Sequence, residues 1–267
     1  MKIKNLIGLR MYYAFGTQVK GNICNYSDYD GIYLYNSNHN KIIGNVCHYN
    51  GSAGIVVNYD SHNNIILQND CKYNNDNGIF LDGRYNTIRS NKCEANANNG
   101  IYMVSTSDII LENICQFNAN YGIDSRESLN IMFMNQITYN EYSTFSNNDT
   151  HLWNSPIKIY YAYNSKQYFN FLGNKYSDHY SSDLDKDGIY DEPYSIPENN
   201  SDNYPLYSTP DTYSLQVWTL LPDSRLVNNF SDDVGMIRIE SNDVHVWKAG
   251  ANAIMLTEQS LWTGQVI

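Results

Sequence analysis

The sequence predicts an all-β protein, a right-handed parallel β-helix, and three observations support this fold class. A Gly-apolar pair recurs at spacings of 23, 23, 24, 22 and 22 residues: Gly8-Leu9, Gly31-Ile32, Gly54-Ile55, Gly78-Ile79, Gly100-Ile101 and Gly122-Ile123. Apolar and polar residues alternate after each pair, as in Ile32-Tyr33-Leu34, which is the pattern of short strands. Asn and Gly are dense and no helical period appears, so helical repeats are excluded. A fixed period of this length is typical of a solenoid, here with coils of 22–24 residues.

Each coil is expected to contain three short strands, with apolar columns inside and Gly and Asn at the corners. In the strand after each glycine, two side chains are expected to face the interior. These pairs are Ile32 and Leu34, Ile55 and Val57, Ile79 and Leu81, and Ile101 and Met103. A second inward column comprises Val19, Ile42, Ile66, Ile88, Ile110 and Met132. Recurring asparagines are expected to stack as amide ladders that satisfy backbone groups at the corners. They are Asn22, Asn45, Asn69, Asn91, Asn113 and Asn135, and five residues after four of them Asn50, Asn74, Asn96 and Asn118.

The five cysteines follow the same period and are expected to form a third inward column. They are Cys24, Cys47, Cys71, Cys93 and Cys115. Cysteine packs as a small hydrophobe where an interior is narrow. Stacked thiols about 4.8 Å apart are too widely spaced for a disulfide, whose Cβ atoms lie roughly 3.8 Å apart. The number is odd and no C-x-x-C occurs, so packing is favoured over metal binding or redox chemistry.

The period divides the chain into three predicted parts. Residues 1–177 form the β-helix, residues 178–211 form an acidic calcium-type loop and linker, and residues 212–267 form a small β module or the start of a further domain. Within the first part, EYSTFSNNDTHLW at 141–153 is predicted to be a loop insertion, after which Ile157 and Ile159 resume the coil pattern. In the last part, SLQVWTL, GMIRIES, DVHVWKA and NAIMLT are predicted strands. Because the first coil is incomplete, a fragment or an alternative start is expected.

Charge and hydropathy exclude two classes of partner. The net charge is -11 and the pI is about 4.8, so no basic stripe is available to bind nucleic acid or an anionic membrane surface. No run of eighteen apolar residues is present, which argues against a membrane span in this chain.

The closing segments resemble a known family. HLWNSPIKIYYAYNSKQYFNFLGNKYSDHY at 151–180, followed by DLDKDGIYDEPYSIPENNSDNYPL at 183–206, is similar to the end of NosD-like proteins of archaeal cell surfaces. The earlier coils resemble the same family's PbH1 repeats, so the resemblance covers residues 1–208. It implies a parallel β-helix and an association with copper, carbohydrate binding or sugar hydrolysis. The family usually has GNYWSDY where this chain has GNKYSDH at 173–179, so Tyr176 replaces a tryptophan.

The motif DLDKDGIYDE at 183–192 predicts a calcium site. Alternating carboxylates followed by a glycine suit the hard oxygen coordination of Ca²⁺. The expected ligands are Asp183, Asp185, Asp187, the Ile189 carbonyl, Asp191 and, by completing the set, Glu192. The twelfth place of a calcium loop wants a bidentate Glu and holds Tyr194, so affinity is expected to be modest. A solvated acidic turn is the alternative interpretation.

Two sets of outward residues are candidates for a binding or catalytic surface. Tyr33, Phe80 and Tyr102 are expected to form an aromatic stripe that binds sugars or a protein, unless a neighbouring segment covers it. Catalysis would use Asp82, Asp124 and Arg126, which are the catalytic candidates because a glycosidase-type or lyase-type site needs carboxylates and a cation on one face. His39 and His62 should share a corner, more as turn residues than as metal ligands.

These observations favour a cell-surface or S-layer-associated β-helix, stabilised by calcium, with a structural, carbohydrate-binding or partner-binding role. The expected partner is a surface glycan or a surface-layer protein, and the expected location is extracellular. Sequons at Asn25, Asn50, Asn148, Asn199 and Asn229 are compatible with export. The alternatives are a polysaccharide lyase or glycoside hydrolase on the same fold, and a copper-handling accessory protein.

Overall fold

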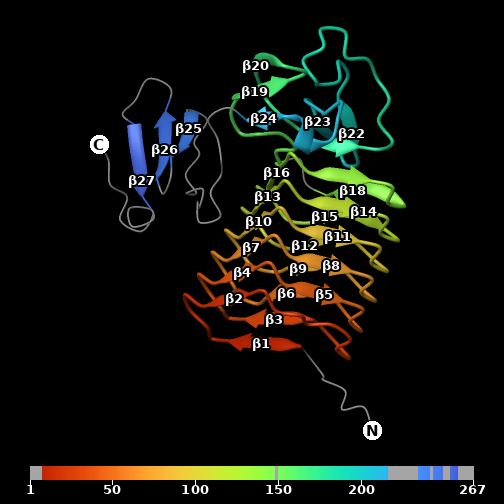
Figure 1. Cartoon of the computed structure of the whole chain (residues 1–267), viewed down its shortest axis with the longest axis vertical. Coiled ribbons are helices and arrows are strands. Elements are labelled where there is room, and N and C mark those ends of the chain that lie inside the picture. The colour runs from red at the N-terminus through yellow and green to blue at the C-terminus, as the bar shows by residue number, and fades with distance from the viewer. Residues whose placement is uncertain (1–7, 148–149, 216–233, 241–242, 249–252, 258–267) are drawn as a thin grey trace.

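The structure is a parallel β-helix, and an acidic segment at residues 178–212 packs on one end of it (Figure 1). The computed structural model describes residues 8–147 and 150–215, and the backbone of residues 234–240, 243–248 and 253–257. Three parallel sheets run along the solenoid, as the alternation of the sequence predicts. The fold class expected from the repeat is therefore confirmed.

The first sheet contains seven strands, each of which begins beside the recurring glycine column. They are β1 (Leu9–Tyr12), β3 (Ile32–Tyr35), β6 (Ile55–Asn58), β9 (Ile79–Leu81), β12 (Ile101–Met103), β15 (Tyr121–Ser125) and β18 (Tyr142–Ser146). The second sheet contains β2 (Gln18–Lys20), β4 (Lys41–Ile43), β7 (Ile65–Leu67), β10 (Thr87–Arg89), β13 (Ile109–Leu111) and β16 (Ile131–Phe133). The third contains β5 (Val46–His48), β8 (Asp70–Lys72), β11 (Lys92–Glu94), β14 (Ile114–Gln116), β17 (Gln136–Thr138) and β21 (Lys175–Tyr176).

The predicted inward columns are the core of the solenoid. The paired residues of the first sheet, from Ile32 and Leu34 onward, are fully buried, and the second-sheet column is buried from Val19 to Met132. The cysteines are buried and free, and they pair coil by coil in the third sheet, as in Cys71 with Cys93. A narrow interior explains both the cysteines and the glycines. A Cβ at Gly78, for example, would lie 2.8 Å from the Cβ of Cys93.

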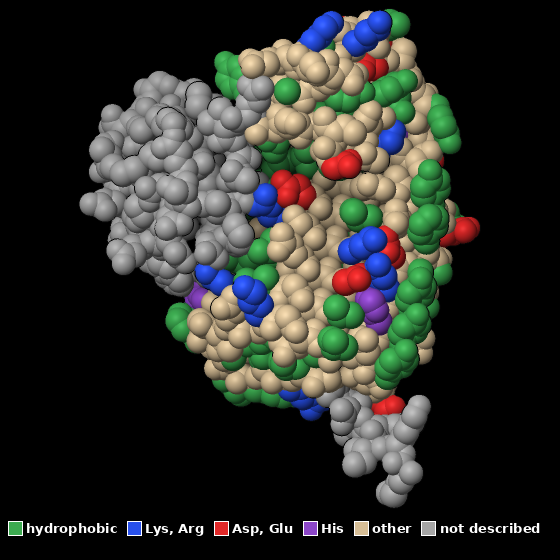
Figure 2. All heavy atoms as spheres, viewed as in Figure 1, with side chains coloured by type: hydrophobic (Ala, Val, Ile, Leu, Met, Phe, Trp, Pro, Cys, Tyr) green, Lys and Arg blue, Asp and Glu red, His purple; other side chains and the backbone are tan. Residues whose placement is uncertain are grey.

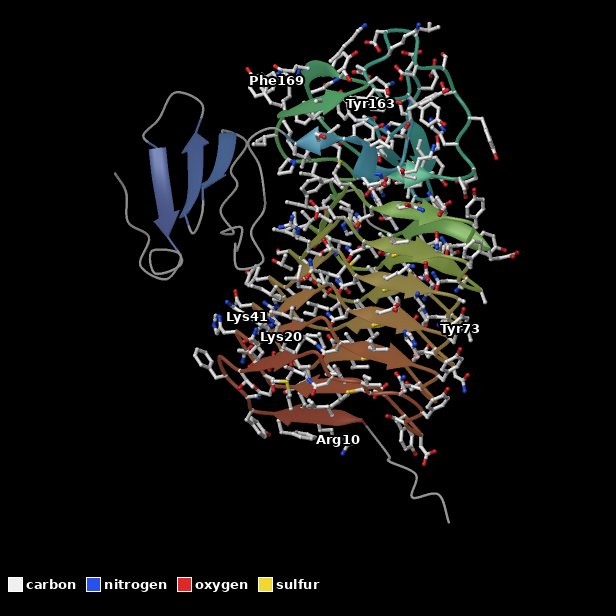
Figure 3. All side chains as sticks on the ribbon, in the orientation of Figure 1. Arg10, Lys20, Lys41, Tyr73, Tyr163 and Phe169 are labelled. Carbon is white, nitrogen blue, oxygen red and sulfur yellow. The ribbon has the colours of Figure 1, made fainter. Side chains whose placement is uncertain are left out.

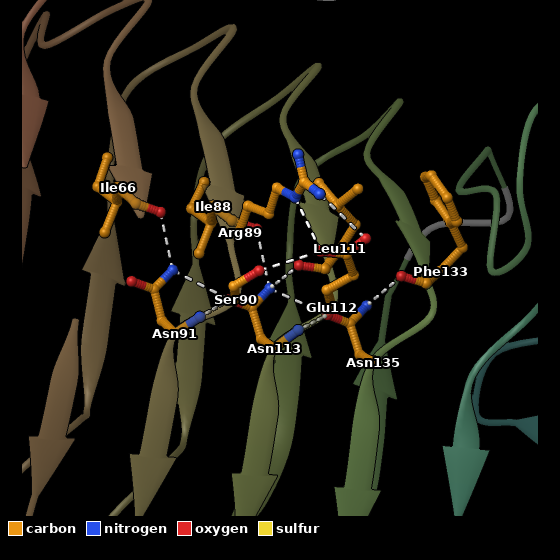
Figure 4. Close-up of polar contacts among 10 residues, drawn as sticks. All are labelled: Ile66, Ile88, Arg89, Ser90, Asn91, Leu111, Glu112, Asn113, Phe133 and Asn135. Carbon is orange, nitrogen blue, oxygen red and sulfur yellow. Dashed lines mark hydrogen bonds and ion pairs between the residues drawn. The ribbon is translucent and has the colours of Figure 1, made fainter. Parts of the chain in front are cut away.

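Asparagine ladders satisfy the corners, as predicted (Figure 4). At Asn91 the backbone N–H and the side-chain amide both donate to Asn113 Oδ1, at 2.9 and 3.0 Å, and the amide also donates to the Ile66 carbonyl. The main ladder continues through Asn135 and Asn174. The second ladder runs from Asn50 to Asn140, and its members include Asn74, Asn96 and Asn118. Asn50 is fully buried in it, so the sequon there does not present its amide for glycosylation.

A third ladder was not predicted. Its members lie where the second-sheet strands begin: Asn40, Asn64, Asn86, Asp108 and Asn130. All five are buried, and one of them is an acid. The corner between the first and second sheets is therefore held in the same way as the other two corners.

The prediction for residues 141–161 was wrong. Residues 141–147 and 150–153 are part of the last coil: they contain β18, and Leu152 bridges to Ile131 in the second sheet. Their inward residues are polar, for Thr144 pairs with Ile123, and this hid the strand from a hydrophobic pattern. PIKIYY instead leads into β19 (Ile159–Tyr163), which pairs antiparallel with β20 (Lys166–Asn170) and β24 (Ser214–Leu215).

The acidic segment packs on the end of the solenoid. It contains β22 (Tyr194–Ile196), β23 (Asn200–Asp202) and the short 3-10 helix η1 (Pro210–Thr212). Tyr194 stacks on the fully buried Tyr176 with 3.7 Å between ring centroids. Asp202 accepts hydrogen bonds from Asn174 and ends the main asparagine ladder.

Beyond the acidic segment, three antiparallel strands form a separate small sheet. They are β25 (Val234–Glu240), β26 (Asp243–Lys248) and β27 (Ala253–Thr257). The predicted strand SLQVWTL lies mostly outside the described residues. None of the helices in the described part of the chain has the length and apolar character needed to cross a membrane.

Candidate functional site

Three of the predicted calcium ligands converge. One carboxylate oxygen each from Asp183, Asp185 and Asp187 lie within 4.8 Å of one another. The chain turns tightly here, since Gly188 donates its N–H to Asp183 Oδ2 at 3.1 Å and has a φ of +91°. Asp183 Oδ1 is buried and has no hydrogen-bond partner among the described residues. A carboxylate oxygen in that position is suited to a cation.

Tyrosine hydroxyls hold the loop in place, and the sequence analysis did not predict these contacts. Tyr161 donates to the Asp187 carbonyl at 3.0 Å and Tyr168 donates to the Lys186 carbonyl at 2.7 Å. Tyr213 donates to the Gly188 carbonyl. A Cβ at Gly188 would lie 2.8 Å from the rings of Tyr163 and Tyr213, so only glycine fits between loop and rings. The three aspartates are thus fixed on a rigid aromatic support.

The side chains of Asp191 and Glu192 do not join the three aspartates, whereas the Ile189 N–H donates to Asp187 Oδ1 at 2.8 Å. Asp191 Oδ2 accepts hydrogen bonds from Ser182 Oγ at 2.8 Å and from the Leu184 N–H at 3.1 Å. Glu192 is exposed and its backbone carbonyl is bonded to His179. The backbone of Ile189 forms a bridge with Leu206. The structure therefore brings together the first three positions of the motif.

The local charge favours a bound cation. Burial raises the pKa of Asp183 and of Asp187, and the neighbouring Asp185 carboxylate raises both further. A divalent ion would offset the repulsion of three like charges. Asn170 Nδ2 lies 3.3 Å from Asp187 Oδ2, but this amide is uncharged and does not neutralise the negative charge of the three aspartates.

The predicted aromatic stripe lies on the outer face of the first sheet. The register places Tyr33, Val56, Phe80, Tyr102 and Asp124 in one column. The Phe80 and Tyr102 rings are in contact, with centroids 5.6 Å apart, and both are half-buried. Val56 separates them from Tyr33, so the stripe consists of a pair and a single ring.

The predicted catalytic residues form an ion pair and do not form a two-carboxylate site. Arg126 donates to both Asp124 oxygens, at 2.6 and 2.9 Å, and its guanidinium lies 4.0 Å from the centroid of the Phe145 ring. Burial raises the pKa of Asp124, against the effect of Arg126. Asp82 is two coils away in the Arg126 column, about 10 Å by strand spacing. The Asp124 carboxylate is engaged by its own coil.

The two corner histidines behave as turn residues. The backbones of His39 and His62 are hydrogen-bonded at 3.1 Å, as their spacing predicts. His62 Nδ1 accepts from the Arg84 N–H and its Nε2 lies 3.5 Å from Asp60. The His39 ring packs against Phe15.

A cleft of about 510 Å³ lies where η1 crosses the solenoid. Its polar lining includes carboxylates and a tyrosine, and a bidentate Arg89–Glu112 ion pair borders it (Figure 4). The lining residues that carry polar side-chain groups are Glu112, Asn113, Gln136, Thr209, Asp211 and Tyr213. Two acids and no base line this cleft among the described residues, so it suits a neutral or cationic group.

The model of one protein family, described as periplasmic copper-binding protein (NosD), matches residues 7–181. This match covers more than half of the chain and includes every coil. The chain belongs to the NosD family. No curated protein matches this NosD-family chain.

Two solved structures similar to this NosD-family chain are alginate or mannuronan epimerases. The periplasmic alginate epimerase AlgG is 22% identical, with a TM-score of 0.46 over 53% of this chain and 36% of that chain. The A-module of the Azotobacter vinelandii mannuronan C-5 epimerase AlgE6 is 17% identical, with a TM-score of 0.47 over 55% of this chain and 56% of that chain. The chain thus spans about a third of AlgG.

The candidate ligand set in the described part of this NosD-family chain does not suit copper. In the described part of the chain, the group of three or more possible ligands is the all-oxygen Asp183–Asp185–Asp187 set. Copper prefers imidazole and sulfur ligands, whereas carboxylates suit calcium and magnesium. The five thiols are buried in the core, where they pack against one another.

Proposed function

We propose that this NosD-family chain is a calcium-stabilised β-helix that works outside the cytoplasm, at the cell surface, and binds carbohydrate without cleaving it. The observation that carries the proposal is the convergence of Asp183, Asp185 and Asp187 on a tyrosine support at the end of the solenoid. A calcium loop with an incomplete ligand set binds in the range of about 10⁻⁴–10⁻³ M that extracellular modules use. Such a site is loaded outside the cell and empty inside it.

The carbohydrate-binding part of the proposal is supported by the aromatic residues of the outer surface. Phe80 and Tyr102 present a joined apolar patch on a flat sheet, and tyrosine hydroxyls add polar contacts at its rim. Catalysis is the weaker alternative because Asp124 is bound bidentately by Arg126 and lies in one column with aromatic residues. A hydrolase-type site would need a second carboxylate facing the first.

Calcium is expected to bind the wild-type chain and to raise its melting temperature. Since the ion binds the folded loop, stability should rise by about 2.7 kcal/mol at a hundredfold excess over the dissociation constant. Asp185→Ala should abolish both the calorimetric heat and the melting shift. Glu198→Gln, which removes an exposed charge from the same acidic segment, should leave both unchanged. Absence of heat and of a shift in the wild type would contradict the proposal.

The binding role is checked with a panel of alginate, polygalacturonate, xylan, cellohexaose and chitohexaose. We expect retention of at least one of them in affinity electrophoresis and no release of reducing or unsaturated ends. Phe80→Ala with Tyr102→Ala should weaken retention by about tenfold, because both rings lose their contact with the sugar. Reproducible chain cleavage that is lost in Asp124→Asn would establish the lyase or hydrolase alternative instead.

A further inference from the structure

A second set of aromatic rings lies along one edge of the solenoid, and the proposed function does not account for it. The edge column comprises Tyr26, Tyr49, Tyr73, Ala95, Phe117 and Tyr139, each two residues after the cysteine column or its continuation. Figure 2 shows hydrophobic side chains running down this edge, and Figure 3 shows Tyr73 there, on the side opposite Lys20 and Lys41. The five aromatic members are between 47% and 70% exposed.

The rings of the edge column stack face to face. Centroids of Tyr26 and Tyr49 are 5.2 Å apart, and those of Tyr49 and Tyr73 are 5.0 Å apart, with the ring planes within 10° of parallel. Phe117 and Tyr139 repeat the geometry at 5.3 Å and 9°. Each ring therefore lies about one strand spacing above the last.

One rung of the edge column has no ring. The backbone continues unbroken through it, since the Tyr73 N–H donates to the Glu94 carbonyl and the Ala95 N–H donates to the Gln116 carbonyl. The φ of Ala95 is +52°, in the same left-handed region as the Tyr73 and Phe117 values of +55° and +57°. Only the ring is missing. Tyr73 and Phe117 face one another across about two strand spacings, roughly 9.6 Å, with the Ala95 methyl as the floor.

The sides of this slot differ in polarity. On one side a ladder of charged residues runs along the third sheet, and Figure 2 shows such a cluster beside the hydrophobic column. Lys72 Nζ lies 2.8 Å from Glu94 Oε2, Lys92 Nζ lies 3.2 Å from Glu94 Oε1, and Gln116 donates to Glu94. On the other side are the small exposed residues Asn75, Ala97 and Ala119, which leave access open.

We propose that the slot between Tyr73 and Phe117 binds one pyranose ring of a polysaccharide, a subsite that rests on the proposed carbohydrate-binding function. A pyranose has two apolar C–H faces and a rim of hydroxyls. The slot offers two aromatic faces at the spacing of one intervening ring, and these attract C–H groups through their negative potential. Lys72, Lys92 and Glu94 form a polar ladder at one rim, where hydroxyls find donors and acceptors. An aromatic side chain would fill the slot but would have no use for that rim.

The test fills or opens the slot in the full chain. Ala95→Tyr completes the column, and it should fold because five neighbours carry a ring in the same backbone conformation. Tyr73→Ala removes one wall. The matched controls are Leu129→Tyr, which adds a ring at an exposed position of the same left-handed conformation at another corner, and Tyr26→Ala, in the same column but away from the slot. Binding is measured calorimetrically with the five glycans named above and with N-acetyl-tyrosinamide.

The expected result is that both slot variants weaken glycan binding by about tenfold, because two ring faces are lost or blocked, while both controls keep wild-type affinity. Glycan binding that survives Ala95→Tyr and is lost only with Phe80→Ala and Tyr102→Ala overturns the slot and leaves the proposed function standing. Binding of N-acetyl-tyrosinamide that Ala95→Tyr abolishes, without binding of any glycan, overturns the pyranose as occupant. No binding of any probe overturns the slot and the carbohydrate role together.

Discussion

Replacing Asp202 with alanine is expected to destabilise the protein by about 3–5 kcal/mol, because the main asparagine ladder then ends on nothing. Asp202 is fully buried, and its Oδ2 accepts from the Asn174 N–H at 2.6 Å, the Asn174 amide at 3.2 Å and the Tyr176 hydroxyl at 3.1 Å. Its Oδ1 accepts from the Tyr204 N–H at 3.0 Å. Each donor left unpaired in the interior costs about 1–3 kcal/mol.

The direction of the ladder explains why an acid stands at its end. Every asparagine donates two hydrogen bonds to the oxygen of the next coil, so the last member must accept without needing a further acceptor beyond it. A carboxylate does this and an amide does not. Asp202→Asn should therefore lose about 1–2 kcal/mol, since its amide would face the Tyr204 N–H.

Urea unfolding of the three chains measures the order wild type, Asp202→Asn, Asp202→Ala. Asp211→Ala is the control, because this aspartate is exposed and, among the described residues, its side chain accepts a hydrogen bond from Thr209 in its own turn. Equal stability of wild type and Asp202→Ala would show that the acidic segment does not close the solenoid. In that case the ladder would have to end on water.

Most of the solenoid could be predicted from the sequence because its structure is local and repeated. Each inward position recurs once per coil, so a small error at one coil is corrected by the next. The cysteine column illustrates this, for Cys47 alone means little, whereas five cysteines in step with Gly and Asn fix the register. The buried, unpaired thiols confirm the packing interpretation.

The end of the solenoid could not be predicted, because there the period no longer governs the chain. Thr144 and Ser146 replace apolar residues inside the last coil, and Tyr176 takes the place of a cysteine. Asp202 joins the ladder from 28 residues beyond Asn174, a separation that no repeat announces. The structure of this region is determined by hydrogen bonding of buried polar groups, and a hydrophobic repeat pattern does not reveal those bonds.

The candidate sites also differ in how far they depend on contacts that are local in the sequence. Asp183, Asp185 and Asp187 are close in sequence, so their convergence follows from local turn geometry. The tyrosines beneath them come from β19, β20 and the segment after η1, and nothing local indicates that contact. The ringless rung at Ala95 was present in the sequence, but it becomes a slot only once the neighbouring rings are seen to stack.

Asp108 is the acid within the third ladder, and it makes stability depend on pH. Its Oδ1 accepts from the Asn86 N–H at 2.6 Å, while its Oδ2 is buried without a partner among the described residues. The neighbouring Asn130 donates from its side-chain amide to the Ser105 carbonyl. In Asp108 the corresponding donor is the O–H of the protonated carboxyl group. Burial raises the pKa of Asp108 from 3.8 to about 7.

The direction of this pH dependence follows from the number of protons bound in the folded and unfolded states. Between pH 4 and pH 7 the folded chain holds a proton on Asp108 that the unfolded chain has released, so the stability that Asp108 contributes is fully present below pH 4 and is lost as pH rises through 7. The rise of the Asp108 pKa from 3.8 to about 7 corresponds to about 4 kcal/mol of unfolding free energy. Burial lowers the pKa of His151, the next rung after Asn130, to about 4, so this side chain is neutral over the upper part of that window and begins to take up a proton near pH 4.

Asp108→Asn is therefore expected to stabilise the protein by about 4 kcal/mol at pH 8 and to change it little at pH 4. The amide restores the ladder without a charge, and every other titrating group contributes equally to both chains and cancels in the difference. Urea unfolding of wild type and variant at pH 4, 6 and 8 gives this difference directly. Asn64→Asp places a second acid in the same buried ladder, one rung beyond Asn86. Relative to wild type, this variant should lose stability as pH rises. A difference between wild type and Asp108→Asn that is constant with pH would mean that Asp108 stays ionised in the folded chain, with Oδ2 reached by solvent.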